Sequence, residues 1–151
     1  MRKFIGTKMI EAKPMNRGEY NLYRGWTLPE DENPEDEGYL TNSPEGHVTW
    51  MPKEQFDVDY RSLDGGMPFG MAIELMKQGY AVARKGWNGK NQFIELASNI
   101  SYVIPGTGEI VNCQHEAIGN QAIAFVGTSG VQMGWLASQA DMLAEDWNVV
   151  E

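Results

Sequence analysis

Several features that are common in secreted, membrane-bound and catalytic proteins are scarce in this sequence. Its 151 residues include a single cysteine, Cys113, which has no internal disulfide partner and fits a reducing cytosol. No apolar run approaches the roughly 18 residues that a membrane-spanning helix needs. The first ten residues, MRKFIGTKMI, lack the apolar core of a secretory signal. We therefore expect no membrane contact and a place in the cytoplasm.

Signatures of catalysis and of metal binding are also scarce. No group of His, Cys and Asp residues has metal-ligand spacing, and no phosphate-binding loop of the G-x-x-x-x-G-K-[ST] kind occurs. Cys113 and His115 would share one side of a strand, which leaves a thiolate–imidazole pair open. A buried structural cysteine is the commoner role, and no third orienting residue is evident. We predict no catalytic residue, no metal and no cofactor.

Positive charge is the third shortage. Lys and Arg total 12 against 21 Asp and Glu, so the formal net charge is -9. That balance argues against binding duplex DNA or anionic lipid, because both require a basic face. Within residues 67–151 every cation lies in a short stretch: Lys77, Arg84, Lys85 and Lys90. This clustering permits a small anion to be held in one local pocket.

Composition divides the chain into residues 1–66 and residues 67–151. The first part contains the acidic run PEDENPEDEGY from Pro29 to Tyr39, and Asp64-Gly65-Gly66 reads as the linker that follows. The acidic run is expected to be a solvated loop, with a partner-binding tail as the alternative. The expected elements are strands 4–13, 38–42 and 47–51, and a helical turn from Pro52.

The second part has clearer periodicity. Apolar residues from Phe69 to Met76 follow helical spacing after Pro68, and Gly79 suits a left-handed end to that helix. The other expected elements are strands 80–84, 92–97, 101–104, 109–113, 122–126, 131–133 and 147–150, and a helix over 139–144. We predict an α+β fold, a small antiparallel sheet with two short helices preceded by an N-terminal β-rich extension.

The string RKGWNGK, which begins at Arg84, combines the clustered cations with an indole. A tight turn at Asn88-Gly89 would bring Arg84 and Lys90 to either side of Trp87, with Phe93 on the returning strand. An indole stacks on a nucleic acid base with about 1–3 kcal/mol, and Arg and Lys bind phosphate oxygens. These residues indicate a pocket for a flat base that carries phosphate. The alternative, of similar weight on the residues alone, is that Trp87 caps the core.

A second polar group lies near the C-terminus. Ser138, Gln139 and Asp141 offer side chains that suit the polar edges of a base or a ribose. Ser138 and Asp141 are also typical of a helix N-terminus, and capping is the better interpretation of Asp141. The neighbouring Trp135 and Trp147 are more typical of a core.

Two longer strings resemble a known family. MPFGMAIELMKQGYAVARKGWNGKNQFIEL and GWLASQADMLAEDWNVV are similar to the phage Thoeris anti-defence family of the second type, over residues 67–151. The resemblance implies a non-enzymatic protein that captures a cyclic ADP-ribose isomer, and in some members cyclic dinucleotides, intact. It also implies a homo-oligomer, usually a tetramer, with pockets between protomers, in the host bacterial cytoplasm.

The resemblance carries ligand contact onto individual residues. Trp87 and Asn88 match the family's tryptophan-containing hairpin, and the motif around Ser138, Gln139 and Asp141 matches a second stretch. Two other functions stay open: an enzyme that hydrolyses or modifies a nucleotide signal, and a structural or regulatory phage protein that acts through its acidic loop.

Overall fold

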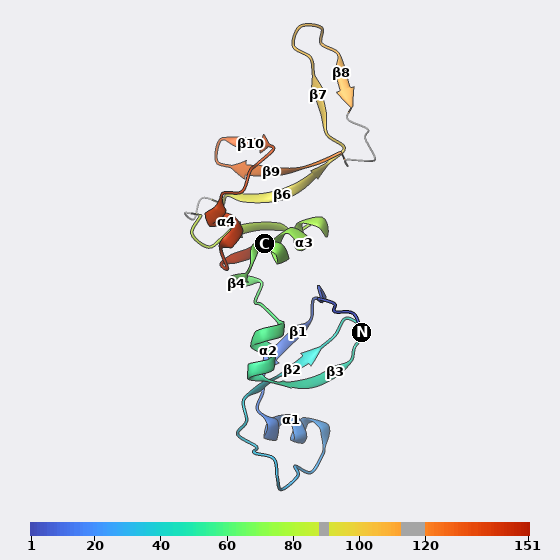
Figure 1. Ribbon diagram of the computed structural model, residues 1–151, viewed down its shortest axis with the longest axis vertical. Helices are drawn as coiled ribbons and strands as arrows, with labels where there is room; N and C mark the ends of the chain where they lie inside the picture. The colour runs from blue at the N-terminus through green and yellow to red at the C-terminus, as the bar shows by residue number, and fades with distance from the viewer. Residues whose placement is uncertain (88–90, 113–119) are drawn as a thin grey trace. The chain divides into compact units, whose positions relative to one another are not determined.

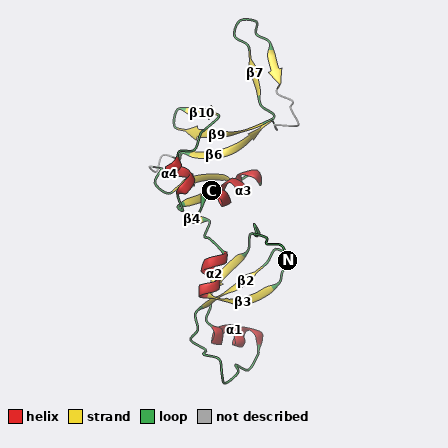
Figure 2. Ribbon diagram, viewed as in Figure 1, coloured by secondary structure: helices red, strands yellow, loops and turns green. Residues whose placement is uncertain are grey.

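The chain folds into two compact units, each with its own sheet. The computed structural model describes residues 1–87, 91–112 and 120–151 (Figure 1). Unit 1 is Met1–Arg61 and unit 2 is Ser62–Glu151. Helices and antiparallel strands occur in both units, which confirms the predicted α+β class (Figure 2). Among the described residues, no helix is both long and apolar enough to cross a bilayer.

Unit 1 consists of a three-stranded antiparallel sheet with two helices. The sheet order is β1-β2-β3, and α2 packs on β2 and β3. The elements are β1 (Glu11–Pro14), α1 (Arg17–Arg24), β2 (Gly38–Asn42), β3 (Val48–Pro52) and α2 (Lys53–Asp59). The acidic run before β2 is mostly exposed, which confirms the predicted solvated loop.

Helix α1 is a feature that the sequence prediction missed. Its start is a capping box, in which the Asn16 side chain accepts from the Glu19 backbone N–H and the Glu19 side chain accepts from the Asn16 backbone N–H. Gly25 ends it at φ 70°, a left-handed conformation that glycine adopts at little cost. The predicted strand over residues 4–13 was largely wrong, since pairing begins only at Glu11.

Unit 2 contains a six-stranded antiparallel sheet and a separate hairpin. The sheet order is β10-β9-β6-β5-β11-β4, and β7 pairs with β8. The elements are β4 (Asp64–Met67), α3 (Phe69–Lys77), β5 (Ala81–Arg84), β6 (Phe93–Ser98), β7 (Ser101–Val103), β8 (Ile110–Asn112), β9 (Gln121–Gly127), β10 (Gly130–Met133), α4 (Gln139–Leu143) and β11 (Trp147–Val150). The last strand therefore lies inside the sheet, between β5 and β4.

Most elements of unit 2 match the prediction within a residue or two, and one does not. Asp64-Gly65-Gly66 was predicted as a linker but belongs to β4, which pairs with β11. The division between the units falls earlier, after Arg61. Gly79, at φ 99°, follows α3 in the left-handed conformation that was predicted.

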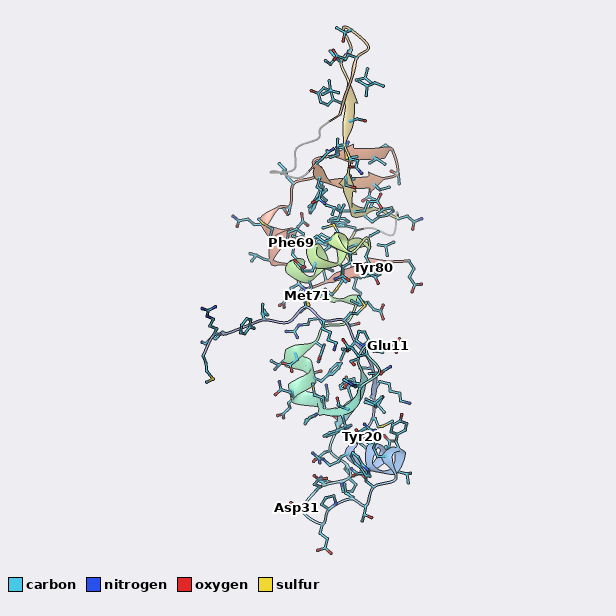
Figure 3. All side chains as sticks on the ribbon, turned by 90° about the vertical axis from the view of Figure 1, so that its right-hand side faces the viewer. Glu11, Tyr20, Asp31, Phe69, Met71 and Tyr80 are labelled. Atoms are coloured by element: carbon cyan, nitrogen blue, oxygen red, sulfur yellow. The ribbon has the colours of Figure 1, made fainter. Side chains whose placement is uncertain are left out.

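The core of unit 2 lies between α3 and the sheet. Helix α3 contacts β5, β6 and β11, and it buries Ala72, Leu75 and Met76. Figure 3 labels Phe69 at the start of this helix and Tyr80 just after its end. The largest fully buried side chain is that of Trp147 on β11. Because β11 is an inner strand of the sheet, the aromatic side chains near it have a rigid support.

Candidate ligand-binding site

Trp87 follows β5 directly and belongs to a group of five aromatic side chains. The Trp87 backbone N–H donates to the Arg84 carbonyl at 3.1 Å, which closes the turn after the strand. Its side chain is half-buried. The aromatic cluster consists of Phe69, Trp87, Phe125, Trp135 and Trp147.

Trp87 touches three members of the aromatic cluster edge to face. Its ring centroid lies 5.7 Å from that of Phe125, 5.8 Å from that of Trp135 and 5.4 Å from that of Trp147. Interplanar angles of 66–74° are the geometry in which the positive edge of one ring meets the negative face of another. The indole therefore helps to close the core, as the structural alternative held, and keeps part of its surface open to solvent.

Arg84 is bound by two carboxylates of the same chain. Its Nε and Nη2 donate to the two carboxylate oxygens of Asp146 at 3.0 and 3.4 Å, and Nη1 donates to Asp141 Oδ1 at 3.0 Å. The Arg84 side chain is only 24% exposed. Sequence reasoning did not find this arrangement, because the partners lie more than 50 positions further along the chain.

The pKa values of this ion-pair group follow from its contacts. Hydrogen bonds to Asp146 and then to Asp141 raise the pKa of Arg84 above its ordinary value. For Asp141, partial burial is the largest single influence and raises the pKa, but hydrogen bonds from Ser138 and Arg84 together outweigh it. The pKa of Asp141 is therefore lowered, and the carboxylate stays ionised near neutral pH.

Ser138 and Asp141 form a capping box at the start of α4. The Asp141 backbone N–H donates to Ser138 Oγ at 3.1 Å, and the Ser138 backbone N–H and hydroxyl donate to Asp141 Oδ2. This confirms the capping interpretation that was preferred for Asp141. Gln139, the first residue of α4, is exposed. Trp147 Nε1 donates to the Asp141 carbonyl at 3.0 Å, so the helix is fixed to the aromatic cluster.

The other predicted site residues fall into two groups. Phe93, the first residue of β6, is half-buried and lies opposite Val126. Asn88 and Lys90, with the predicted tight turn between them, lie outside the described residues. Cys113 and His115, the residues considered for a thiolate–imidazole pair, also lie outside the described residues. Ligand contact by the predicted site residues stays a prediction.

A concave region of about 450 Å³ lies in unit 1 and not at the aromatic cluster. Its lining includes Glu19, Glu35 and Glu37 with one cation, Lys53. An excess of carboxylates disfavours an anionic ligand, since like charges repel. The charges that line this hollow therefore disfavour it as the place for a phosphate-bearing ligand.

Comparison with known proteins assigns unit 2 to a family. Residues 67–150 match the Thoeris anti-defense 2-like domain. The chain belongs to this family. It is also similar to Thoeris anti-defense 2 of Bacillus phage SP01, with 43% identity over 88 residues. That alignment covers 56% of this chain and 94% of the relative.

Membership of the Thoeris anti-defense 2-like family confirms the resemblance read from the two long strings. It supports a phage anti-defence role directed against Thoeris. The matched region contains the whole aromatic cluster, Arg84 and both of its carboxylate partners. All of unit 1 lies outside the matched region.

Proposed function

We propose that the chain binds a cyclic nucleotide immune signal, of the cyclic ADP-ribose class or a cyclic dinucleotide, and sequesters it without cleavage. Removal of the signal would leave the Thoeris effector inactive inside the infected cell. The family assignment supports the anti-defence part of this proposal. The observation that carries the binding part is Trp87, a half-buried indole that keeps part of its surface open to solvent and is held by three aromatic neighbours.

Rigid support matters because capture must be tight. Nanomolar binding corresponds to about 12 kcal/mol. An indole that is already fixed by Phe125, Trp135 and Trp147 loses little conformational entropy when a base stacks on it. A cyclic ligand is itself restricted before binding, which lowers the entropic cost further.

Backbone and cations beside Trp87 suit the phosphate part of such a ligand. Lys85 is exposed on the turn. Gly86 is exposed beside it, and a Cβ placed there would meet no atom within 4 Å in the part of the chain that the structure describes. Arg84 is already neutralised by Asp141 and Asp146. We propose that Arg84 holds the turn in place and that Lys85 and Lys90 supply charge to the phosphates.

Exposed apolar side chains in unit 2 support the proposed homo-oligomer, with a tetramer as the expected state. They lie on β10, in the segment that follows it and on α4, and in a monomer they are exposed to water: Val131, Met133, Leu136, Met142 and Leu143. Light scattering on the purified chain gives the mass directly. A charged substitution at Leu136, such as Leu136→Asp, should lower the measured mass, and a monomeric mass for the unaltered chain would contradict the proposal.

Calorimetric titration with a cyclic ADP-ribose isomer tests the role of Trp87. We expect Trp87→Ala to weaken binding by about 1–3 kcal/mol, roughly 5- to 150-fold, because one stacking contact is lost. Trp87→Phe should retain most of the affinity. Trp26→Ala, which removes an exposed indole of unit 1, is the matched control and should bind normally. A folded Trp87→Ala protein with unchanged affinity would show that Trp87 is only a core residue.

A further inference from the structure

Unit 1 carries an unpaired N-terminal arm, residues 1–10, whose chemistry is unusual for an acidic chain. Phe4 and Ile5 are 92% and 95% exposed. Arg2 and Lys3 directly precede them, and among the described residues neither cation has an ion-pair partner. The start of the arm therefore presents positive charge beside exposed apolar groups.

The same unit carries a surface of opposite character, formed by the end of α1 and the loop that follows. Leu22, Tyr23 and Trp26 are exposed there. The loop over residues 29–37 adds six carboxylates. In the described chain only one of these, Glu32, forms an ion pair, with Arg17. This acidic–aromatic surface, consisting of Leu22, Tyr23, Trp26 and residues 29–37, matches the arm in both charge and apolarity.

The acidic–aromatic surface is ordered before any partner arrives. The Arg24 guanidinium lies over the rings of Tyr20 and Trp26, at 5.5 and 5.3 Å from their centroids. Backbone hydrogen bonds fix the loop on the first turn of α1, from Arg17 N–H to the Asp36 carbonyl and from Gly18 N–H to the Pro34 carbonyl. A fixed surface loses little entropy on binding, so modest contacts are sufficient to hold a flexible arm.

Within one copy, the arm and the acidic–aromatic surface lie at opposite ends of the β1–β2 strand pair. Strand β1 pairs Glu11 with Asn42 and Pro14 with Tyr39. The arm precedes Glu11, whereas the acidic loop enters β2 at the Tyr39 end. Lys8 also pairs with Glu45, beyond the Asn42 end, at 2.6 Å. In Figure 3, Glu11 and Asp31 lie at opposite ends of unit 1, with Tyr20 between them.

We propose that the N-terminal arm of one copy docks on the acidic–aromatic surface of a second copy. Two copies whose first units lie antiparallel satisfy both contacts at once, which gives a closed two-fold pair. Arg2 and Lys3 then face the carboxylates of the loop, and Phe4 and Ile5 cover Tyr23 and Trp26. The contact lies outside the family region, and it adds an association between first units whether or not unit 2 captures a nucleotide.

Carbodiimide cross-linking of the full chain tests this contact, since the reagent joins an amine to a carboxylate that already touches it. Equal amounts of ¹⁴N- and ¹⁵N-labelled protein are mixed, cross-linked and digested for mass spectrometry. We expect mixed-isotope peptides that join Lys3 to the loop over residues 29–37. The Lys8–Glu45 ion pair is the internal control and should give cross-links within one copy. The proposal would be overturned if cross-links between Lys3 and the loop carried one isotope only. It would also be overturned if Lys3 formed no cross-link to the loop.

Charge reversal provides the second test. The arm variant is Arg2→Glu with Lys3→Glu, and the loop variant is Glu30→Lys, Asp31→Lys and Glu35→Lys. All of these positions are exposed, so both variants should fold. Each variant alone should give few intercopy cross-links. The arm variant lacks the Lys3 amine, and in the loop variant the introduced lysines repel Lys3. Mixing the two variants should restore a cross-link between the introduced groups.

Failure to restore this cross-link would contradict pairing between copies. Nucleotide titrations should be unchanged in both variants, which keeps this result separate from the proposed function.

Discussion

At the residue scale, the Trp147 side chain joins several elements of unit 2. It is fully buried, and on β11 it lies opposite Arg84 of β5 and Met67 of β4. Its Nε1 donates to the Asp141 carbonyl, and its ring contacts those of Phe69, Trp87 and Trp135. The support of the candidate site is therefore the same set of contacts that stabilises the sheet.

Replacement of Trp147 by alanine should destabilise unit 2 strongly. A large buried aromatic side chain costs about 3–5 kcal/mol when it is truncated to alanine. Chemical denaturation followed by circular dichroism measures the change. Val103→Ala, on an exposed side chain of the β7–β8 hairpin, is the control and should alter stability little. A loss below about 1 kcal/mol for Trp147→Ala would contradict the packing described here.

The lowered pKa of Asp141 predicts how stability depends on pH. In the unfolded chain, Asp141 binds a proton more readily, with a pKa near the ordinary 3.8. The contribution of the Asp141 carboxylate to folding stability is therefore fully present above that pH. It should fall as the pH drops further, through the lowered pKa of the folded state. Thermal unfolding between pH 7 and pH 2 should therefore show a smaller acid-dependent loss for Asp141→Asn than for the unaltered chain. Parallel curves for the two proteins would contradict the assignment.

At the element scale, the two short capped helices, α1 and α4, show which local sequence signals are sufficient to predict the start of a helix. Ser138 and Asp141 begin α4 as the sequence predicts, because both partners of a capping box lie within four residues. Asn16 and Glu19 carry the same signal for α1, but a strand was predicted immediately before them and the helix was missed. The strands of the β7–β8 and β9–β10 hairpins were predicted within a residue or two, since glycine-containing turns between apolar runs mark their ends locally.

Loss of the α1 cap should weaken unit 1 alone. Asn16→Ala removes the acceptor for the Glu19 backbone N–H and should cost about 1 kcal/mol. Ser138→Ala removes the equivalent acceptor from α4 and should affect unit 2 instead. Hydrogen exchange resolved by peptide distinguishes the two units. Equal loss of protection in both units from either substitution would contradict their separate cores.

Pairings between distant segments set the limit of the sequence prediction. Asp64-Gly65-Gly66 resembles a linker by composition, and only the return of β11 turns it into a strand. Trp87 was identified as a site residue from its neighbours in the chain. Its packing against Phe125 and Trp135, and the binding of Arg84 by Asp146, depend on the sheet order, which no local pattern records. The sequence thus indicated candidate ligand residues, whose ligand contact stays a prediction, but it did not indicate the residues that support them.

At the scale of the whole molecule, two units divide the proposed roles. Unit 2 contains the family region with the candidate site, and unit 1 contributes the arm and the acidic–aromatic surface. The family model matches residues 67–150, and 56% of this chain is sufficient to match 94% of the relative from Bacillus phage SP01. Nucleotide capture should therefore be separable from association through the first units.

Removal of residues 1–61 tests that separation. The remaining unit keeps its own sheet and core, so we expect it to fold and to bind a cyclic ADP-ribose isomer with a dissociation constant close to that of the full chain. Calorimetric titration of both proteins gives the comparison. Loss of binding in a folded unit 2 would place part of the ligand site in unit 1.

Recovery of the bound molecule tests the central claim most directly. The full chain is incubated with a cyclic ADP-ribose isomer, separated from free ligand, denatured by heat and analysed by mass spectrometry. Sequestration predicts that the released nucleotide has its original mass, in an amount proportional to the protein. A cleaved or modified nucleotide, or no captured nucleotide at all, would contradict it.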